Sequence, residues 1–235
     1  MNNDYASIFS SILRENQIKT NEPMKRHTTF GIGGPADCFL MPETTEEVCL
    51  ITKLAHKHEV PLFVLGGGAN LLVRDKGIRG AVVFTGRLHR MERKGNLLTV
   101  ASGVPTAAAA RKALEYGLSG MEFASGIPGS IGGAAYMNAG AYGGEMAKII
   151  VSATTCDAKG DIIVHSIKDM GYGYRHSPFM QNGEVILDIT LSLKPGNQKD
   201  IEALMKDLNQ RRATKQPLEK RSAGSTFKRP DGHFV

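Results

Sequence analysis

Apolar residues recur with helical spacing in the stretch that follows Thr44. Thr44 and Glu47 also have the spacing of a capping box, in which each side chain bonds to the backbone N–H of the other residue. The residues that would form the apolar face are Val48, Ile51, Leu54 and Ala55. The pattern therefore predicts an amphipathic helix that begins just after Thr44.

Short apolar runs alternate with helical patterns along the rest of the chain. They predict strands at 61–65, 81–85, 97–101, 149–156, 161–164 and 185–193. A second helix is predicted between Pro105 and Tyr116, and Gly117 would end it. The layout is that of an α+β or α/β protein.

The clearest linker is Pro195-Gly196-Asn197, so we expect a break near residue 196. A last helix is predicted beyond it. The residues expected on its buried face are Ile201, Leu204, Met205 and Leu208.

A chain of 235 residues with 41% hydrophobic residues can bury a sizeable core without covalent cross-links. Its three cysteines show no paired spacing, so neither a disulfide framework nor a metal site is expected. The N-terminus lacks the pattern of a signal peptide, and no apolar run is long enough to cross a bilayer. These features favour a soluble cytoplasmic protein that does not bind membranes.

Positive charge is concentrated late in the chain, although the net charge of the whole is only +6. Between residues 199 and 229, nine Lys or Arg stand against four Asp or Glu. The segment should prefer anions, but it lacks interleaved aromatic residues and common nucleic-acid-binding motifs. We therefore expect a phosphorylated small molecule rather than nucleic acid.

A predicted strand runs into three successive glycines in Val64-Leu65-Gly66-Gly67-Gly68-Ala69-Asn70. Without side chains in the way, successive backbone N–H groups can converge on a pyrophosphate. For an isolated glycine triplet, a tight surface turn is the more common explanation.

A second segment, residues 124–144, is very rich in small residues, including Gly126, Gly129, Gly132 and Gly133. Such a composition is expected where the backbone passes close to something flat and extended, as a dinucleotide cofactor is. A flexible linker is the alternative, but the interspersed large apolar residues make it a poor explanation.

Two other phosphate-binding signatures are excluded. No Gly-Lys-Ser or Gly-Lys-Thr occurs, so there is no Walker A loop. Gly31-Ile32-Gly33-Gly34-Pro35-Ala36 matches the letters of a Rossmann fingerprint, but the run that follows is strand-like and stops at Pro42. No room remains for the helix whose N-terminus would hold the phosphates.

Two shorter motifs carry polar residues in constrained settings. Arg175 lies among aromatic residues in 173–179, and Ser225 follows Gly224 in 221–230. A flanked Arg can be held rigidly beside a developing anion, and a Ser after Gly can be exposed on a tight turn. Taken singly, such residues are more often a surface ion-pair partner and a helix cap.

Together, in this order, the four motifs resemble the UDP-N-acetylenolpyruvoylglucosamine reductases, FAD enzymes with the cofactor fold of the vanillyl-alcohol-oxidase and p-cresol-methylhydroxylase group. The resemblance runs from about His27 to the last residue and is closest to the subclass without an extra tyrosine-bearing loop. It implies an α+β fold with FAD-binding subdomains at 1–85 and 86–195. Residues 196–235 would begin a substrate-binding domain that is cut short, so this form would bind FAD through residues 27–195 but turn over poorly.

The resemblance also implies roles for individual residues. FAD would be held by Gly66, Gly67, Gly68, Ala69, Asn70, Gly126, Pro128, Gly129, Ser130, Gly133 and Arg212. The substrate would be contacted by Tyr174, Lys215, Lys228 and Arg229. Ser225 would be the proton donor, and Arg175 would stabilise the charged intermediate.

The implied reaction passes a hydride from NADPH through FAD to the enolpyruvyl group of a UDP-sugar, a step in building the bacterial cell wall. Two alternatives stay open: a flavin oxidase of the same cofactor fold acting on an alcohol, and a flavin-binding module without catalysis. Bleaching of a bound flavin by NADPH would favour the reductase. Peroxide production from an alcohol would favour the oxidase. The oligomeric state is left open.

Overall fold

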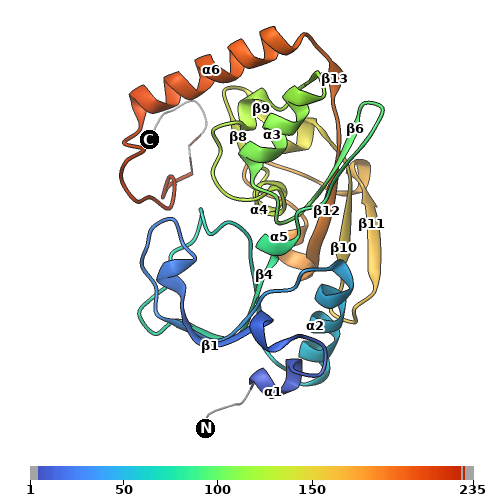
Figure 1. The fold of residues 1–235 in the computed structure, drawn as a ribbon, viewed down its shortest axis with the longest axis vertical. Helices are drawn as coiled ribbons and strands as arrows, with labels where there is room; N and C mark the ends of the chain where they lie inside the picture. Colours follow the sequence, from blue (N-terminus) through green and yellow to red (C-terminus); the bar gives the residue numbers. More distant parts are fainter. Residues whose placement is uncertain (1–4, 229, 231–235) are drawn as a thin grey trace.

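The computed structural model describes residues 5–228 and 230. Two β-sheets dominate the fold, one built from the first third of the chain and one from the middle (Figure 1). Figure 1 shows the last helix, α6 (Gln198–Lys215), lying across the far end of the molecule, and the segment after it returning toward the loops above the first sheet.

The first sheet has four strands in the order β1-β2-β4-β3. Their bounds are β1 Ile18–Pro23, β2 Pro35–Leu40, β3 Leu62–Leu65 and β4 Ile78–Phe84. β1 is antiparallel to β2, whereas β2, β4 and β3 are mutually parallel. Because parallel strands end at the same edge of a sheet, the loops that follow them are gathered together.

Both faces of the first sheet are covered. Accordingly, β2 and β4 have apolar residues at successive positions rather than at alternate ones. α1 (Tyr5–Phe9) and α2 (Thr45–Lys57) cover one face, where Phe9, Ile51 and Ala55 are buried. The other face packs under Met24 and Val73. As the sequence predicts, β2 rather than a helix follows the glycines at 31–34.

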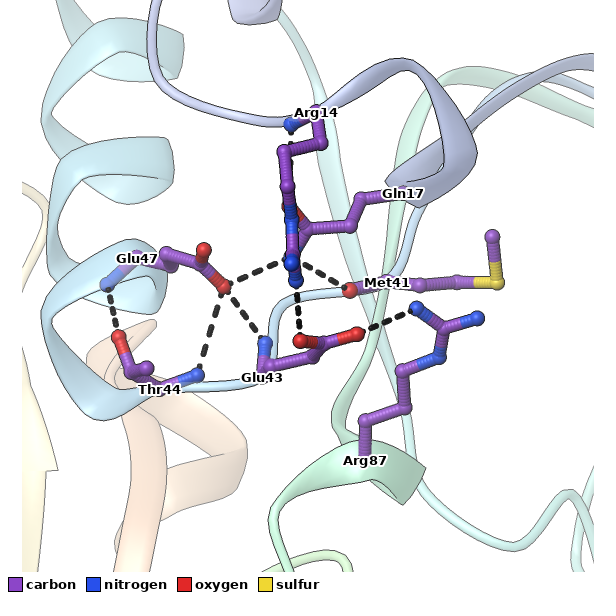
Figure 2. A network of polar contacts seen from close by, with 7 residues as sticks. All are labelled: Arg14, Gln17, Met41, Glu43, Thr44, Glu47 and Arg87. Atoms are coloured by element: carbon purple, nitrogen blue, oxygen red, sulfur yellow. Dashed lines mark hydrogen bonds and ion pairs between the residues drawn. The ribbon is translucent and has the colours of Figure 1, made fainter.

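The N-terminus of α2 has the predicted capping box, which Figure 2 shows. The N–H of Glu47 donates to the Thr44 hydroxyl oxygen at 3.1 Å. The Glu47 carboxylate accepts from the N–H of Thr44 at 3.4 Å, from that of Glu43 at 2.6 Å and from Nε2 of Gln17 at 2.9 Å. The box therefore also ties α2 to the segment before β1.

Two arginines from distant segments meet beside this box at Glu43 (Figure 2). Arg14 precedes β1, and Arg87 lies after β4 at 2.8 Å from the carboxylate. Since these side chains are partly exposed, the pairs contribute little to stability, and the cap contributes more.

Replacing Thr44 by Ala removes the oxygen that accepts from Glu47. We expect this to lower the free energy of unfolding by about 1 kcal/mol. Thr44→Ser keeps the oxygen and should lose much less. Urea unfolding followed by circular dichroism measures both variants, and equal losses would show that the methyl group rather than the cap is responsible.

The second sheet has five antiparallel strands in the order β11-β10-β12-β6-β5. Their bounds are β5 Met91–Lys94, β6 Leu97–Ala101, β10 Ile150–Cys156, β11 Ile162–Ser166 and β12 Val185–Ser192. One face packs against α3 (Thr106–Glu115) and α4 (Ile131–Tyr136) in the largest core cluster. The opposite face carries polar residues such as Thr99 and Thr190, whose hydroxyls are 3.0 Å apart.

α2 links the two sheets, since Val48 belongs to the core of the second. On the same helix, the hydroxyl of Thr52 lies 3.1 Å from Sγ of Cys156 on β10. This contact ties α2, which packs on the first sheet, to a strand of the second sheet.

Shorter elements complete the chain. They are α5 Phe179–Asn182, β7 Leu118–Ser119, β8 Gly140–Ala141, β9 Gly144–Glu145 and β13 Lys194–Pro195, with 3₁₀ turns at Glu15–Gln17, Met24–Arg26, Thr85–Arg87, Glu122–Ala124, Met146–Lys148 and Ile167–Asp169. None of the helices in the described part of the chain has both the length and the apolar composition to span a bilayer.

The prediction for the face of α6 is correct in part. Ile201 and Leu208 are buried and Met205 packs against the core, but Leu204 is 46% exposed. α6 lies on the turn Glu122–Ala124 and on α3 along a narrow stripe. Leu204 lies at the margin of that stripe, so its side chain stays largely in solvent.

Candidate functional site

The two glycine-rich segments of the sequence lie against each other. We call residues 66–70, which follow β3, the first glycine loop, and residues 126–133, which lead into α4, the second glycine loop. A Cβ placed on Gly67 would lie 2.6 Å from Cα of Gly129, and one on Gly66 would collide with the hydroxyl of Ser130. The close approach of these loops therefore requires glycine at both positions.

The first glycine loop is held from its other side by the segment after β1. Gly68 has a φ of +63°, and a Cβ there would collide with the carbonyl oxygen of His27. The Gly68 carbonyl accepts from the N–H of Thr29 at 3.1 Å. A left-handed glycine is thus required where the chain turns beneath this segment.

The second glycine loop is fixed by its connection to α3 and α4. The N–H of Thr106 donates to the Gly129 carbonyl at 3.0 Å, and the N–H of Gly132 donates to the Ser102 carbonyl at 2.9 Å. Ser130 caps α4 by accepting from the N–H of Gly133 at 3.4 Å.

Several backbone donors at this junction have no protein acceptor. The N–H groups of residues 67–70 donate to no acceptor in the described part of the chain, and the same is true of Gly126, Gly129 and Ser130. Backbone N–H groups are seldom left unpaired, so these donors are available to water or to a ligand. N–H groups that converge from two loops suit an anion such as a pyrophosphate.

α6 brings a cation to the second glycine loop. A Cβ on Gly126 would lie 3.2 Å from Cδ of Arg212 and 2.6 Å from Oδ1 of Asn209. The hydroxyl of Ser125 lies 3.4 Å from the same Asn209 oxygen. Arg212 is therefore placed where its charge can complement an anion on the loop, and Lys215 follows at the exposed end of α6.

Arg175 is anchored to the glycine-rich segment that continues beyond α4. Its Nη1 donates to the carbonyl of Asn138 at 3.2 Å, and its Nη2 donates to the carbonyl of Gly140 at 3.0 Å. The guanidinium also lies over the ring of Tyr174, with Cζ 5.3 Å from the ring centroid. These contacts hold the side chain in one orientation, mainly through carbonyl groups rather than through the flanking aromatic residues.

The segment after α6 returns to the first glycine loop, and Figure 1 shows its course. Nη1 of Arg221 donates to the Gly31 carbonyl at 3.3 Å, and the hydroxyl of Thr29 donates to the Ser222 carbonyl at 2.5 Å. A Cβ on Gly224 would lie 3.9 Å from the carbonyl oxygen of Ala69. Ser225 therefore directly follows a residue that lies beside the first glycine loop.

The predicted cofactor residues are thus brought together at one junction, and the motif with Ser225 reaches it from the opposite end of the chain. Ser225 and Lys228 are exposed, and neither is hydrogen-bonded to another described residue. No hydrogen bond joins Ser225 to Arg175 within the described residues. Arg229 lies outside the residues that the structure describes.

Three contributions to this junction escape the sequence analysis: the segment His27–Thr29 that supports the first loop, the anchor at Arg221, and Asn138 beneath Arg175. Each depends on hydrogen bonds between segments that are far apart in the sequence. For Asn138 the residue type itself is a sequence signal, because Asn is enriched in left-handed backbone. The structure gives this Asn a φ of +40°.

A basic groove lies next to the first glycine loop. It is lined by Lys25, Arg26, Thr28, Gly31 and Arg221. His27 lies between the lining residues Arg26 and Thr28 in the sequence. Oε1 of Glu22 accepts from its Nε2 at 2.8 Å, and its ring stacks on Phe39 with centroids 4.2 Å apart.

Charge around Glu22 determines its protonation. Burial by itself raises the pKa of Glu22, but the hydrogen bond from His27 and the charges of Lys19 and Arg26 outweigh burial and hold the pKa below its ordinary value of 4.5. The ionised carboxylate of Glu22 is therefore the form that binds His27 and stabilises the segment under the first glycine loop.

Glu22→Gln is expected to lower the free energy of unfolding at neutral pH by about 1–3 kcal/mol, the usual contribution of a hydrogen bond to a charged group. Because the folded-state pKa of Glu22 is depressed, this contribution is present above its ordinary value of 4.5 and is lost as the pH falls through the lower folded-state value. Urea unfolding of both proteins from pH 7 downward measures it. Glu92→Gln, at an exposed position of β5, is the matched control, and a difference that grows on acidification would contradict this assignment.

Comparisons with known proteins agree with this geometry. Residues 36–166, more than half of the chain, match the FAD binding domain family. UDP-N-acetylenolpyruvoylglucosamine reductase of Clostridium kluyveri (strain NBRC 12016) is 47% identical over 232 residues, which cover 99% of this chain and 76% of that protein.

Solved structures are similar as well. That of UDP-N-acetylenolpyruvylglucosamine reductase from Thermus caldophilus matches with a TM-score of 0.79 and 34% identity, over 91% of this chain and 75% of that one. An alkyldihydroxyacetonephosphate synthase matches with a TM-score of 0.61 at 16% identity, over 82% of this chain and 43% of that one. At 16% identity, the second likeness shows the fold alone. Together the comparisons confirm the predicted α+β cofactor fold.

Proposed function

The chain belongs to the UDP-N-acetylenolpyruvoylglucosamine reductase family, and we propose on that basis that it reduces the enolpyruvyl group of UDP-N-acetylglucosamine enolpyruvate to UDP-N-acetylmuramate, with FAD as cofactor and NADPH as hydride donor. The reaction belongs to peptidoglycan synthesis. We also propose that the protein is located in the cytoplasm. The observation that carries the proposed function is the junction of the two glycine loops, where both loops have backbone N–H groups without an acceptor among the described residues.

The residues at this junction fit FAD. The first glycine loop offers its unpaired N–H groups to the pyrophosphate, and the absence of side chains at Gly66 and Gly67 lets the two loops meet. From the second loop, Gly126, Pro128, Gly129, Ser130 and Gly133 would line the rest of the nucleotide. The charge of Arg212 beside Gly126 would offset part of the charge of the two phosphates.

When FAD is bound, its chemistry supplies the hydride relay from NADPH to the terminal carbon of the enolpyruvyl group. As hydride arrives, negative charge develops as an enolate that extends into the substrate carboxylate. Arg175 would stabilise this charge, because its guanidinium is held in place before the reaction and needs little reorganisation. Tyr174 would flank the same group.

Protonation of the adjacent carbon completes the reaction, and we assign it to Ser225. Ser225 is exposed and directly follows Gly224, which lies beside the first glycine loop, and in the described residues its hydroxyl has no hydrogen-bond acceptor that would compete for its proton. A serine hydroxyl is a weak acid, which suits it only to a strongly basic enolate. Lys215 and Lys228 would contact the anionic substrate, and Arg229, outside the described residues, is assigned the same role.

The test uses the purified protein under anaerobic conditions. A visible flavin spectrum, bleaching by NADPH and recovery of the oxidised spectrum on addition of the enolpyruvyl nucleotide sugar are the expected results. Bleaching without recovery would argue against this substrate. Rapid peroxide formation from an alcohol in air would instead indicate a flavin oxidase, and colourless protein that binds no added FAD would overturn the cofactor assignment.

A further inference from the structure

We propose that Asn138 is a positioning residue for Arg175: its side chain fixes the turn that carries Arg175 to the glycine-rich segment that the guanidinium contacts. This inference rests on the role of Arg175 in the proposed function. Asn138 is a buried polar residue, only 2% exposed, and the mechanism above does not use its side chain.

Asn138 forms two hydrogen bonds to the turn that carries Arg175 and one to Ala147. Its Nδ2 donates to the carbonyl of Gly173 at 2.9 Å, and its Oδ1 accepts from the N–H of Ala147 at 2.9 Å. Its own carbonyl accepts from Nη1 of Arg175 at 3.2 Å. A single residue thus holds both the backbone of the turn and the guanidinium at its tip.

The backbone around this contact adopts conformations that must be held by surrounding interactions. Asn138 has a φ of +40° and Arg175 a φ of +52°. Left-handed backbone costs a residue such as Arg about 1–2 kcal/mol, whereas Asn tolerates it. The turn at Arg175 is closed by two hydrogen bonds between Gly173 and His176, of 3.2 and 3.1 Å, and Asn138 is the side chain that holds this turn from outside.

The anchoring leaves the charge of Arg175 available. Both of its acceptors are uncharged carbonyls, those of Asn138 and Gly140, and within the described residues Arg175 forms no ion pair. Carbonyls on Nη1 and Nη2 fix the plane of the guanidinium, and its remaining N–H groups stay free for an anionic group. The side-chain amide of Asn138 acts on the turn through Gly173, and its backbone carbonyl accepts from the guanidinium, so both contacts of Asn138 leave the charge of Arg175 uncompensated.

The direct test is Asn138→Gly, which keeps the backbone conformation and the carbonyl that accepts from Arg175 but removes the link to Gly173. FAD content and the rate of flavin bleaching by NADPH should stay within about twofold of the unchanged protein. Reoxidation by the enolpyruvyl nucleotide sugar should slow by about ten- to a hundredfold, as expected when a reacting group is displaced by an ångström or less. Asn21→Gly is the matched control, since Asn21 also has a positive φ, +51°, but is exposed on β1.

A double-mutant cycle with Arg175→Lys distinguishes action through Arg175 from a purely structural role of Asn138. If Asn138 acts through Arg175, then Asn138→Gly should cost little further rate once Arg175 is Lys, so the two effects do not multiply. Multiplying effects, or no effect of Asn138→Gly alone, would overturn the inference. If Arg175→Lys by itself left reoxidation unchanged, the proposed role of Arg175 would fail instead.

A second variant guards against loss of the fold. Asn138→Asp keeps the size, the tolerance of left-handed backbone and the acceptor for Ala147, but sets a carboxylate oxygen against the carbonyl of Gly173. It should show the same selective slowing of reoxidation, with FAD retained. Equal losses in both half-reactions would mean that Asn138 supports the cofactor site rather than Arg175, and the inference would be wrong.

Discussion

Gly67→Asp should give a folded protein that purifies without FAD. The position has ordinary backbone, but a Cβ there would lie 2.6 Å from Cα of Gly129, so the two glycine loops must separate. The new carboxylate would also lie where the pyrophosphate is proposed to bind. Like charges in direct contact cost several kcal/mol, which corresponds to a loss in FAD affinity of about a hundredfold or more.

The flavin-to-protein absorbance ratio measures retention, and titration of the apoprotein with FAD measures the affinity. Gly67→Ala separates the steric effect from the charge and should lose less. Gly95→Asp is the control for an added charge, because nothing lies within 4 Å of a Cβ at that glycine and Asp is one of the few residues that adopt its left-handed φ of +62°. If Gly67→Asp retained a full complement of FAD, the first glycine loop would not be the pyrophosphate site.

Ser225→Ala should abolish one half-reaction and spare the other. The hydroxyl is the proposed proton source for the substrate carbon, so reoxidation by the enolpyruvyl nucleotide sugar should fall by about a hundred- to ten-thousandfold, the usual contribution of a general acid. Bleaching of the flavin by NADPH needs no such proton and should be unchanged. Anaerobic stopped-flow absorbance resolves the two steps.

Ser222→Ala controls for disturbance of the same segment. Its hydroxyl accepts from the N–H of Gly224 at 3.1 Å, so this variant loosens the turn but leaves Ser225 intact. It should be much less impaired. Were Ser225→Ala to bleach and recover at normal rates, the serine would have no part in the reaction, and equal loss of both steps would indicate damage to the cofactor site.

Much of the fold could be predicted from local sequence patterns. The capping box at Thr44 does start a helix, and the predicted strand at 97–101 coincides with β6. Such elements are encoded by side-chain periodicity and by residues at their own ends. β5, in contrast, has only polar residues after Met91, and no period of two with an apolar face marks it as a strand.

The order of the strands could not be predicted, because it depends on contacts between distant segments. β6 pairs with β12, for example, although some ninety residues separate the bonded hydroxyls of Thr99 and Thr190. The exposure of Leu204 has a similar origin. Helical spacing identifies an apolar face, but only the shape of the neighbouring surface decides how wide the covered stripe is.

The residue types of the candidate site could be predicted from the sequence, but their arrangement in space could not. Glycine spacing identified both loops, since a backbone that must approach another surface closely excludes side chains. That the two loops approach each other at Gly67 and Gly129 depends on the tertiary fold. The positive φ of Arg175 likewise depends on a distant contact, because the turn that carries it is held through Gly173 by the side chain of Asn138.

The contact between Thr29 and Ser222 joins residues 193 positions apart in the chain. Closing a loop of this length is entropically costly unless the intervening sheets already bring its ends together, so we expect the segment that carries Ser225 to dock late in folding. The hydrogen bonds at Thr29 and Arg221 are exposed and together contribute only about 1–3 kcal/mol, so the docked segment opens locally without unfolding the sheets. We therefore expect a minor form in which the segment is released, and the population of the docked form sets an upper limit on the fraction of molecules in which the proposed proton donor is in place.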